Sequence, residues 1–119
     1  MKLDKVQNLL DATVLTTTSW QDVEVHSAFG CDLMSDVLAF VKDQSLLLTG
    51  LVNPQVIRTA EMLDINVIVF VRGKKPTPEM VDLAQKLNMI VMCTEKSLYT
   101  SSGLLFSEGL AGNGEQECF

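Results

Sequence analysis

The chain has 119 residues, of which 47% are hydrophobic, and its formal net charge at pH 7 is −6. This length predicts a single domain, and this share of hydrophobic residues is sufficient for a core. The negative charge argues against binding to nucleic acid, whose phosphates require clustered Lys and Arg side chains, and against docking on an anionic membrane.

Several features indicate a cytoplasmic protein. No apolar run approaches the roughly 20 residues that span a bilayer. The N-terminal residues MKLDK lack the apolar segment of a signal peptide. The cysteines, Cys31, Cys93 and Cys118, are odd in number and widely spaced, which favours reduced thiols over a disulfide framework.

The first elements are short. Apolar residues at helical spacing predict a helix over residues 3–10. A β-branched run predicts a strand over residues 13–18, and partial alternation predicts a second strand over residues 23–28 after a turn.

The next stretch is expected to form a sharp turn, a helix and a strand. Gly30 adopts positive φ easily and predicts the turn. An apolar stripe predicts a helix over residues 32–42, with Asp32 in its first turn, where carboxylates are favoured. The apolar run at residues 46–48 predicts a strand over residues 45–49 that is covered on both faces.

The second half of the chain repeats this alternation. Asn-Pro and Thr-Pro pairs are typical of helix starts, because the polar side chain accepts from free N–H groups and Pro fits the first turn. Gly103 lies inside the last predicted helix, where it costs up to roughly 1 kcal/mol relative to Ala, and close backbone packing would explain it. The expected elements are a helix from Asn53-Pro54, a strand over 67–71, a helix from Thr77-Pro78, a strand over 89–93 and a helix over 97–107 that Ser97 caps.

The order of these elements predicts the fold class. Apolar strands that alternate with helices indicate right-handed βαβ units. We expect a three-layer α/β/α domain with a mostly parallel central sheet of about five strands, to which the first two strands add an edge. Residues 1–110 form this domain, and the polar, Gly-containing residues 111–119 are expected to form a flexible tail.

The segment DLMSDV at residues 32–37, with the strands and capped helices that follow it, resembles a DRTGG domain over nearly the full chain. This resemblance implies a fold similar to the N-terminal domain of HPr kinase/phosphorylase. It also implies a regulatory role and pairing of domains, because DRTGG domains occur between CBS domains in some inorganic pyrophosphatases. The residues that name the family are mostly absent: the loops read Gly50-Leu51-Val52-Asn53-Pro54 and Val71-Arg72-Gly73.

We expect no catalytic residues. Phosphoryl transfer of the HPr kinase type requires a P-loop, G-x-x-x-x-G-K-[ST]. The run Gly73-Lys74-Lys75 lacks the upstream glycine and the following Ser or Thr. His26 and Ser27 are neighbours on a predicted strand and point to opposite faces, so they cannot form a nucleophilic relay.

A metal or other cofactor is not expected either. Asp32 and Asp36 lie one helical turn apart and suit a hard cation, but no third oxygen ligand is evident. Favourable placement of carboxylates at a helix start explains them as well. A thiolate site made of Cys31, Cys93 and His26 matches no known ligand spacing.

A small-anion site is the strongest candidate. Open α/β sheets bind ligands in the loops at the carboxyl ends of their strands. Arg72, Lys74 and Lys75 are three of the nine basic residues and share one such loop. A solvated loop with ordinary helix caps is the other interpretation. The candidate residues for an anion such as a nucleotide are Phe29, Gly30, Asp32, Thr49, Gly50, Asn53, Arg72, Gly73, Lys74, Thr94 and Ser97.

The leading hypothesis is therefore a non-catalytic regulatory or sensory domain. It forms a homodimer, binds a small anion such as a nucleotide, and passes its state to an unidentified protein partner. The homodimer follows from the resemblance and from the frequency of two-fold dimers. The alternative is an adaptor or assembly module without a ligand, and the third hypothesis is an enzyme that uses the strand-end crevice.

Overall fold

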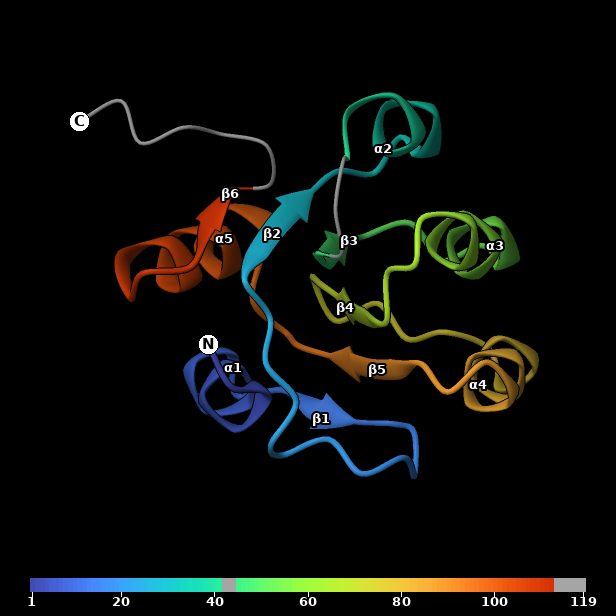
Figure 1. Ribbon diagram of the computed structural model, residues 1–119, viewed down its shortest axis with the longest axis horizontal. Coiled ribbons are helices and arrows are strands. Elements are labelled where there is room, and N and C mark those ends of the chain that lie inside the picture. Colours follow the sequence, from blue (N-terminus) through green and yellow to red (C-terminus); the bar gives the residue numbers. More distant parts are fainter. Residues whose placement is uncertain (42–44, 113–119) are drawn as a thin grey trace.

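A computed structural model describes residues 1–41 and 45–112 of the chain (Figure 1). In this part, helices and strands alternate for most of the length. The elements are α1 (Leu3–Leu10), β1 (Thr13–Val14), β2 (Ser27–Gly30), α2 (Met34–Phe40), β3 (Leu46–Thr49), α3 (Pro54–Met62), β4 (Val67–Phe70), α4 (Pro78–Lys86), β5 (Ile90–Cys93), α5 (Leu98–Ser107) and β6 (Ala111–Gly112).

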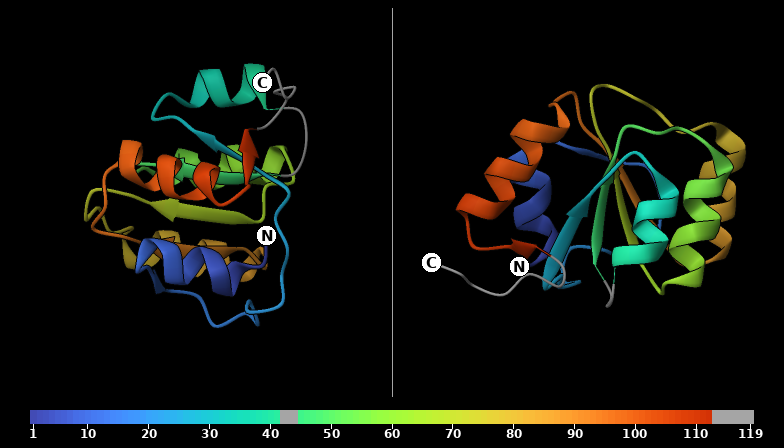
Figure 2. Two further views of the ribbon diagram at one scale, coloured as in Figure 1. Left: turned by 90° about the vertical axis from the view of Figure 1, so that its left-hand side faces the viewer. Right: turned by 90° about the horizontal axis from the view of Figure 1, so that it is seen from above.

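The strands form one sheet in the order β1-β5-β4-β3-β2-β6. Every neighbouring pair is parallel except β1 and β5. The register places Leu48 beside Val69, and Val69 beside Met92. Because β2, β3, β4 and β5 run in the same direction, the loops that follow them lie along one edge of the sheet, at the top of the right-hand view in Figure 2.

Helices cover both faces of the sheet. In Figure 1, α2, α3 and α4 lie on one side and α1 and α5 on the other. Each residue of β3, β4 and β5 is buried. Alternate side chains enter opposite layers: Leu47 and Ile68 pack beneath α2, α3 and α4, whereas Leu48 and Val69 pack beneath α1 and α5. The predicted three-layer α/β/α fold with a mostly parallel sheet is confirmed.

Three helices begin with the predicted side-chain caps. Asn53 Oδ1 accepts from the Gln55 N–H at 2.8 Å, and Thr77 Oγ1 accepts from the Met80 N–H at 3.3 Å. Ser97 Oγ accepts from the Thr100 N–H at 3.1 Å. These bonds satisfy amide groups that have no partner within the helix.

The strand predicted over residues 13–18 is wrong beyond Val14. β1 pairs with β5 at the edge of the sheet, and the Leu15 N–H still donates to the Val91 carbonyl at 2.8 Å. The Thr16 hydroxyl then accepts from the Val91 N–H at 3.3 Å. The Thr16 side chain thus takes the place of a backbone acceptor beside β5, and the strand ends. A β-branched composition alone does not extend a strand.

The second strand is shifted relative to its prediction over residues 23–28. The Val23 carbonyl accepts from the Leu3 N–H at 2.8 Å, and the Val25 N–H donates to the Met1 carbonyl at 2.8 Å. This segment therefore holds the N-terminus in place. β2 begins later, at Ser27, and enters the sheet between β3 and β6.

Gly30 has a role other than the predicted turn. The described glycines with positive φ are Gly73 and Gly109. A Cβ atom at Gly30 would lie 3.1 Å from Leu98 Cδ1 and 3.3 Å from Ser102 Oγ. Its missing side chain allows α5 to pack closely against β2.

The predicted tail needs a correction at its start. β6 (Ala111–Gly112) pairs in parallel with β2, which makes it a sixth strand where about five were expected. A two-residue strand containing Gly carries no alternation that sequence patterns can detect. The rest of the predicted tail, residues 113–119, lies outside the described residues, as does Cys118.

Across residues 1–41 and 45–112, none of the helices has both the length and the apolar character that crossing a bilayer requires.

Ser101 provides a test of the packing between α5 and the sheet. Its side chain is 0% exposed, and its hydroxyl has no hydrogen-bond partner among the described residues. Ser101→Ala should raise the free energy of unfolding by about 1–2 kcal/mol, because it removes an unsatisfied buried hydroxyl and improves helix propensity. Chemical denaturation measures the effect. Thr100→Ala, at an exposed position of α5, is the control for propensity alone, about 0.5 kcal/mol. An equal gain in both variants would contradict the explanation.

Candidate functional site

Asp32 brings three other predicted site residues together at the carboxyl edge of the sheet. Its Oδ1 accepts from the Gly50 N–H at 2.6 Å and from the Thr49 hydroxyl at 3.3 Å. Its Oδ2 lies 3.2 Å from Arg72 Nη2. Residues from the loops after β2, β3 and β4 thus meet around one carboxylate.

This position corrects the interpretation of Asp32 as a residue of the first helical turn. The helix α2 begins at Met34, and its N-cap residue, Leu33, makes no side-chain cap. The Asp32 carboxylate instead holds the loop that follows β3. A carboxylate that accepts from a backbone amide and an arginine makes charge-assisted bonds, which are stronger than neutral ones.

Gly50 is required for the position of Arg72. A Cβ atom at Gly50 would lie 2.9 Å from the guanidinium carbon of Arg72 and 3.0 Å from its Nε. The guanidinium therefore lies directly over the Gly50 backbone. Any side chain at Gly50 would displace it from Asp32.

Arg72 and Gly73 form a tight turn that joins two loops. Their φ angles are 60° and 70°, and the Lys74 N–H donates to the Val71 carbonyl at 3.1 Å. Positive φ at both central residues is typical of a type I′ turn. The Arg72 N–H donates to the Lys96 carbonyl at 2.8 Å, and the Gly73 N–H donates to the Thr94 carbonyl at 2.9 Å. The loop after β4 is thereby fixed to the loop after β5.

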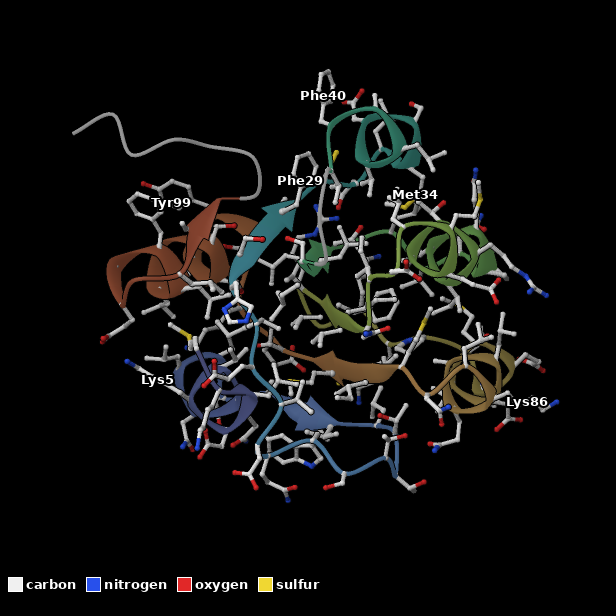
Figure 3. All side chains as sticks on the ribbon, in the orientation of Figure 1. Lys5, Phe29, Met34, Phe40, Lys86 and Tyr99 are labelled. Carbon is white, nitrogen blue, oxygen red and sulfur yellow. The ribbon has the colours of Figure 1, made fainter. Side chains whose placement is uncertain are left out.

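Several other predicted site residues have structural contacts of their own. The side chains of Asn53 and Ser97 cap α3 and α5. The buried Thr94 hydroxyl donates to the Leu10 carbonyl at 2.6 Å and accepts from the Lys96 N–H at 3.3 Å. Phe29 is half-buried against the layer of α2, α3 and α4 (Figure 3). Gly30, as described above, lies against α5.

The donors that remain at the surface are basic. The side chains of Arg72 and Lys74 are exposed. The Gly50 amide and the Thr49 hydroxyl, in contrast, already donate to Asp32. The side chains of Arg72 and Asp32 are 50% and 44% exposed. An ion pair this accessible to solvent contributes at most about 1 kcal/mol. The ion pair with Arg72 therefore adds little to the hold on the Asp32 carboxylate, which also accepts from the Gly50 amide and the Thr49 hydroxyl.

The described residues offer little else for chemistry. Among them, no group of three or more His, Cys, Asp or Glu side chains is placed to hold a metal ion. The Cys31 Sγ accepts from the Leu33 N–H at 3.3 Å, which stabilises the turn before α2. His26 is exposed.

Cys93 lies at the end of β5, beside a hollow of about 170 Å³ that Lys75 and Glu95 also line. Burial raises the pKa of the Cys93 thiol above its ordinary value of 9.0. The positive charge of Lys75 lowers this pKa and the negative charge of Glu95 raises it, both less than burial does. The thiol is therefore protonated, and weakly nucleophilic, at neutral pH.

No family model and no curated protein matches this sequence. Among solved structures, the chain is similar to the CBS and DRTGG domains of the regulatory region of Clostridium perfringens pyrophosphatase, which was solved in complex with its activator, diadenosine tetraphosphate. The TM-score is 0.70 at 17% sequence identity, and the match covers 87% of this chain. This chain spans 45% of that one, less than half its length.

At this level of identity the match concerns the fold. The chain has a DRTGG-like α/β fold, and the predicted resemblance is confirmed at that level. The pyrophosphatase region is regulatory, and it binds a nucleotide.

Thr94, one of the predicted ligand-binding residues, should stabilise the fold through its two hydrogen bonds. Thr94→Val removes the donor to the buried Leu10 carbonyl and the acceptor for the Lys96 N–H, so the free energy of unfolding should fall by about 1–3 kcal/mol. Urea denaturation measures the loss. Thr13→Val, at an exposed position of β1, is the control and should change stability by no more than about 0.5 kcal/mol. A loss below this limit at Thr94 would contradict the assignment.

Cys93 should give the protein a distinct pH dependence at alkaline pH. Because the folded-state pKa lies above 9.0, the unfolded chain releases the thiol proton first, and stability falls as pH rises through that range. The contribution is fully present below pH 9.0. The parent should lose more unfolding free energy between pH 8 and pH 10 than Cys93→Ala does, as measured by denaturation at each pH. If the unfolding free energies of the two proteins fall equally with pH, the raised pKa of Cys93 is refuted.

Proposed function

We propose that this chain is a non-catalytic regulatory domain that binds a small phosphate-bearing ligand, such as a nucleotide, at the carboxyl edge of its sheet. The observation that carries this proposal is the Asp32 carboxylate, held by the Gly50 amide, the Thr49 hydroxyl and Arg72. These groups already donate to one anionic group, and a phosphate oxygen can accept the same kinds of hydrogen bond.

The exchange is favourable on electrostatic grounds. A phosphate carries more negative charge than a carboxylate and binds arginine through two parallel hydrogen bonds. Lys74 follows the Arg72–Gly73 turn in the sequence and adds a second positive charge to this loop, while the Glu95 carboxylate lies over Gly73. The surface pair between Arg72 and Asp32 offers little resistance.

Displacement of Asp32 also provides a means of signalling. Asp32 lies two residues before α2, a seven-residue helix whose only fully buried residues are Met34 and Val37. Leu33 and Phe40 expose large apolar side chains on this helix or at its start. When a ligand takes the place of Asp32, the loop before α2 loses its main tether. The apolar surface of α2 can then report the bound state to a protein partner.

We further propose that the chain forms a homodimer and works in the cytoplasm. The pairing follows the resemblance to DRTGG domains and the frequency of two-fold assemblies. Support for a regulatory role, rather than an enzymatic one, comes from the regulatory pyrophosphatase region that shares the fold.

An adaptor without a ligand is the second candidate. It is favoured by the same carboxylate, because Asp32 satisfies the donors of Thr49, Gly50 and Arg72 without any added anion. In that case the Asp32 cluster only fixes three loops, and the exposed apolar residues serve assembly.

Binding is tested by the melting temperature in the presence of AMP, ADP, ATP, diadenosine tetraphosphate and inorganic phosphate. A ligand that binds only the folded state raises this temperature. Arg72→Ala should weaken the affinity about 10- to 100-fold, the effect of losing a charged hydrogen bond. Asp32→Asn should strengthen it, because the competing charge is gone while an amide oxygen remains for the Gly50 N–H.

Arg58→Ala is the matched control. Arg58 is an exposed arginine on α3 that pairs with Glu61 and lies outside the strand-end loops. Its replacement should leave the affinity unchanged. If no probe shifts the melting temperature, the adaptor is the better account. If Arg72→Ala binds as the parent does, the ligand lies elsewhere.

A further inference from the structure

The helix α5 differs from the other helices in composition. From Ser97 to Ser107 it contains no Asp, Glu, Lys or Arg, whereas α1, α2, α3 and α4 each carry at least one charged residue. A helix without a charged face is normally buried all round. In this chain, one side of α5 packs on the sheet through Ser101 and Leu105, and the opposite side is exposed at Tyr99 and Gly103.

The side of α5 that faces away from the sheet carries two aromatic residues. Tyr99 is 89% exposed and Phe106 is 53% exposed. Helical geometry places Tyr99, Ser102, Gly103 and Phe106 along one face, because they are spaced by three, four and seven residues. We name these four residues the α5 face. Figure 3 shows Tyr99 on the outer side of α5, away from α3 and α4.

A hollow of about 600 Å³ lies against this face, between α5 and the strands β2 and β6. Its lining is mostly apolar and includes Leu48, Leu104 and Leu110. A hollow of this size accepts aromatic side chains, which anchor protein interfaces when they fill apolar pockets.

Gly103 is unexplained within the single chain. Glycine inside a helix costs up to about 1 kcal/mol relative to Ala. A Cβ atom here would meet no atom of the described structure within 4 Å. The close backbone packing expected from the sequence is therefore not made by the described part of this chain, and a second molecule can make it.

We propose that the α5 face is the interface of the homodimer, formed by antiparallel packing of α5 against its copy. Tyr99 and Phe106 lie at equal distances in sequence from the midpoint between Ser102 and Gly103. A two-fold axis through that midpoint places Tyr99 opposite the partner's Phe106, and Phe106 opposite the partner's Tyr99. The same surface thus complements itself, as a two-fold interface requires.

The small residues lie where the two helices cross. Ser102 and Gly103 allow the backbones to approach, while the aromatic rings on either side enter the hollows. The core of such an interface is depleted of charge and enriched in aromatic residues, as α5 is. The inference deepens the proposed homodimer, but it is independent of ligand binding at Arg72.

Sedimentation equilibrium tests the interface. The parent should be a dimer, and Gly103→Glu should raise the dimer dissociation constant roughly 100-fold or more, because two like charges meet at the axis. The folded monomer should tolerate this change, since the site is open and Glu forms helices better than Gly. Far-UV circular dichroism checks the fold. Met62→Glu, at a position of α3 that is 72% exposed, is the control and should leave the dimer intact.

A charge exchange tests the orientation of the helices. Tyr99→Glu and Phe106→Lys should each weaken the dimer, and the two changes together in one chain should restore it by pairing Glu with the partner's Lys. A double variant weaker than either single one would overturn the antiparallel arrangement.

Three other outcomes would overturn the proposal. A monomeric parent would remove the dimer, and a dimer that persists in Gly103→Glu would place the interface elsewhere. Loss of the dimer when the chain is shortened after Gly112 would show that dimerisation requires residues 113–119 and not the α5 face alone. Each result is distinguishable from the ligand test, because the melting-temperature shift depends on Arg72 and not on α5.

Discussion

The fold depends on burial of β3, β4 and β5 on both faces. Every residue of these strands is buried, and all of them except Thr49 are apolar. Neither face of the central sheet can therefore be exposed to water. Burying apolar surface yields roughly 25 cal/mol per Å². Two layers of helices are therefore required. Parallel strands also need long crossovers, and the helices supply both the cover and the connection.

This constraint determines where polar chemistry can occur. With both faces covered, polar side chains from different strands can meet only at the ends of the sheet. Asp32, Thr49 and Arg72 follow or end three adjacent strands, β2, β3 and β4. Their side chains meet because the strands are parallel and adjacent. The Arg72–Gly73 turn is fixed to the loop after β5 by two backbone hydrogen bonds, which adds rigidity to this cluster.

The sequence predicted the central elements well, because their signals are local. The apolar runs of β3, β4 and β5 and the caps Asn53, Thr77 and Ser97 depend only on neighbouring residues. The edges were harder to predict. β1 ends after Val14 because the Thr16 side chain replaces the backbone, and Val23 and Val25 pair with the N-terminus. Such pairings depend on distant partners, and β-propensity does not identify them.

The site shows the same limit. Asp32 and Gly50 were both predicted, but the 2.6 Å bond between them joins residues 18 positions apart and leaves no pattern in the sequence. The turn role assigned to Gly30 also failed, since its need for a small residue comes from Leu98 and Ser102. Conversely, the sequence shows that Gly103 lowers the stability of its helix. No contact among the described residues explains why glycine occupies this position.

Gly30 connects the two surfaces that this fold offers. It ends β2, only two residues before Asp32, and its α-carbon lies against Leu98 and Ser102 of α5. A change in the Asp32 loop therefore acts on a strand end that is packed directly against the helix of the α5 face. The contact is tight, since a single added methyl group would lie 3.1 Å from Leu98. Closely packed contacts transmit displacements rather than absorbing them. The same strand end thus joins the Asp32 carboxylate at the sheet edge to the uncharged helix α5.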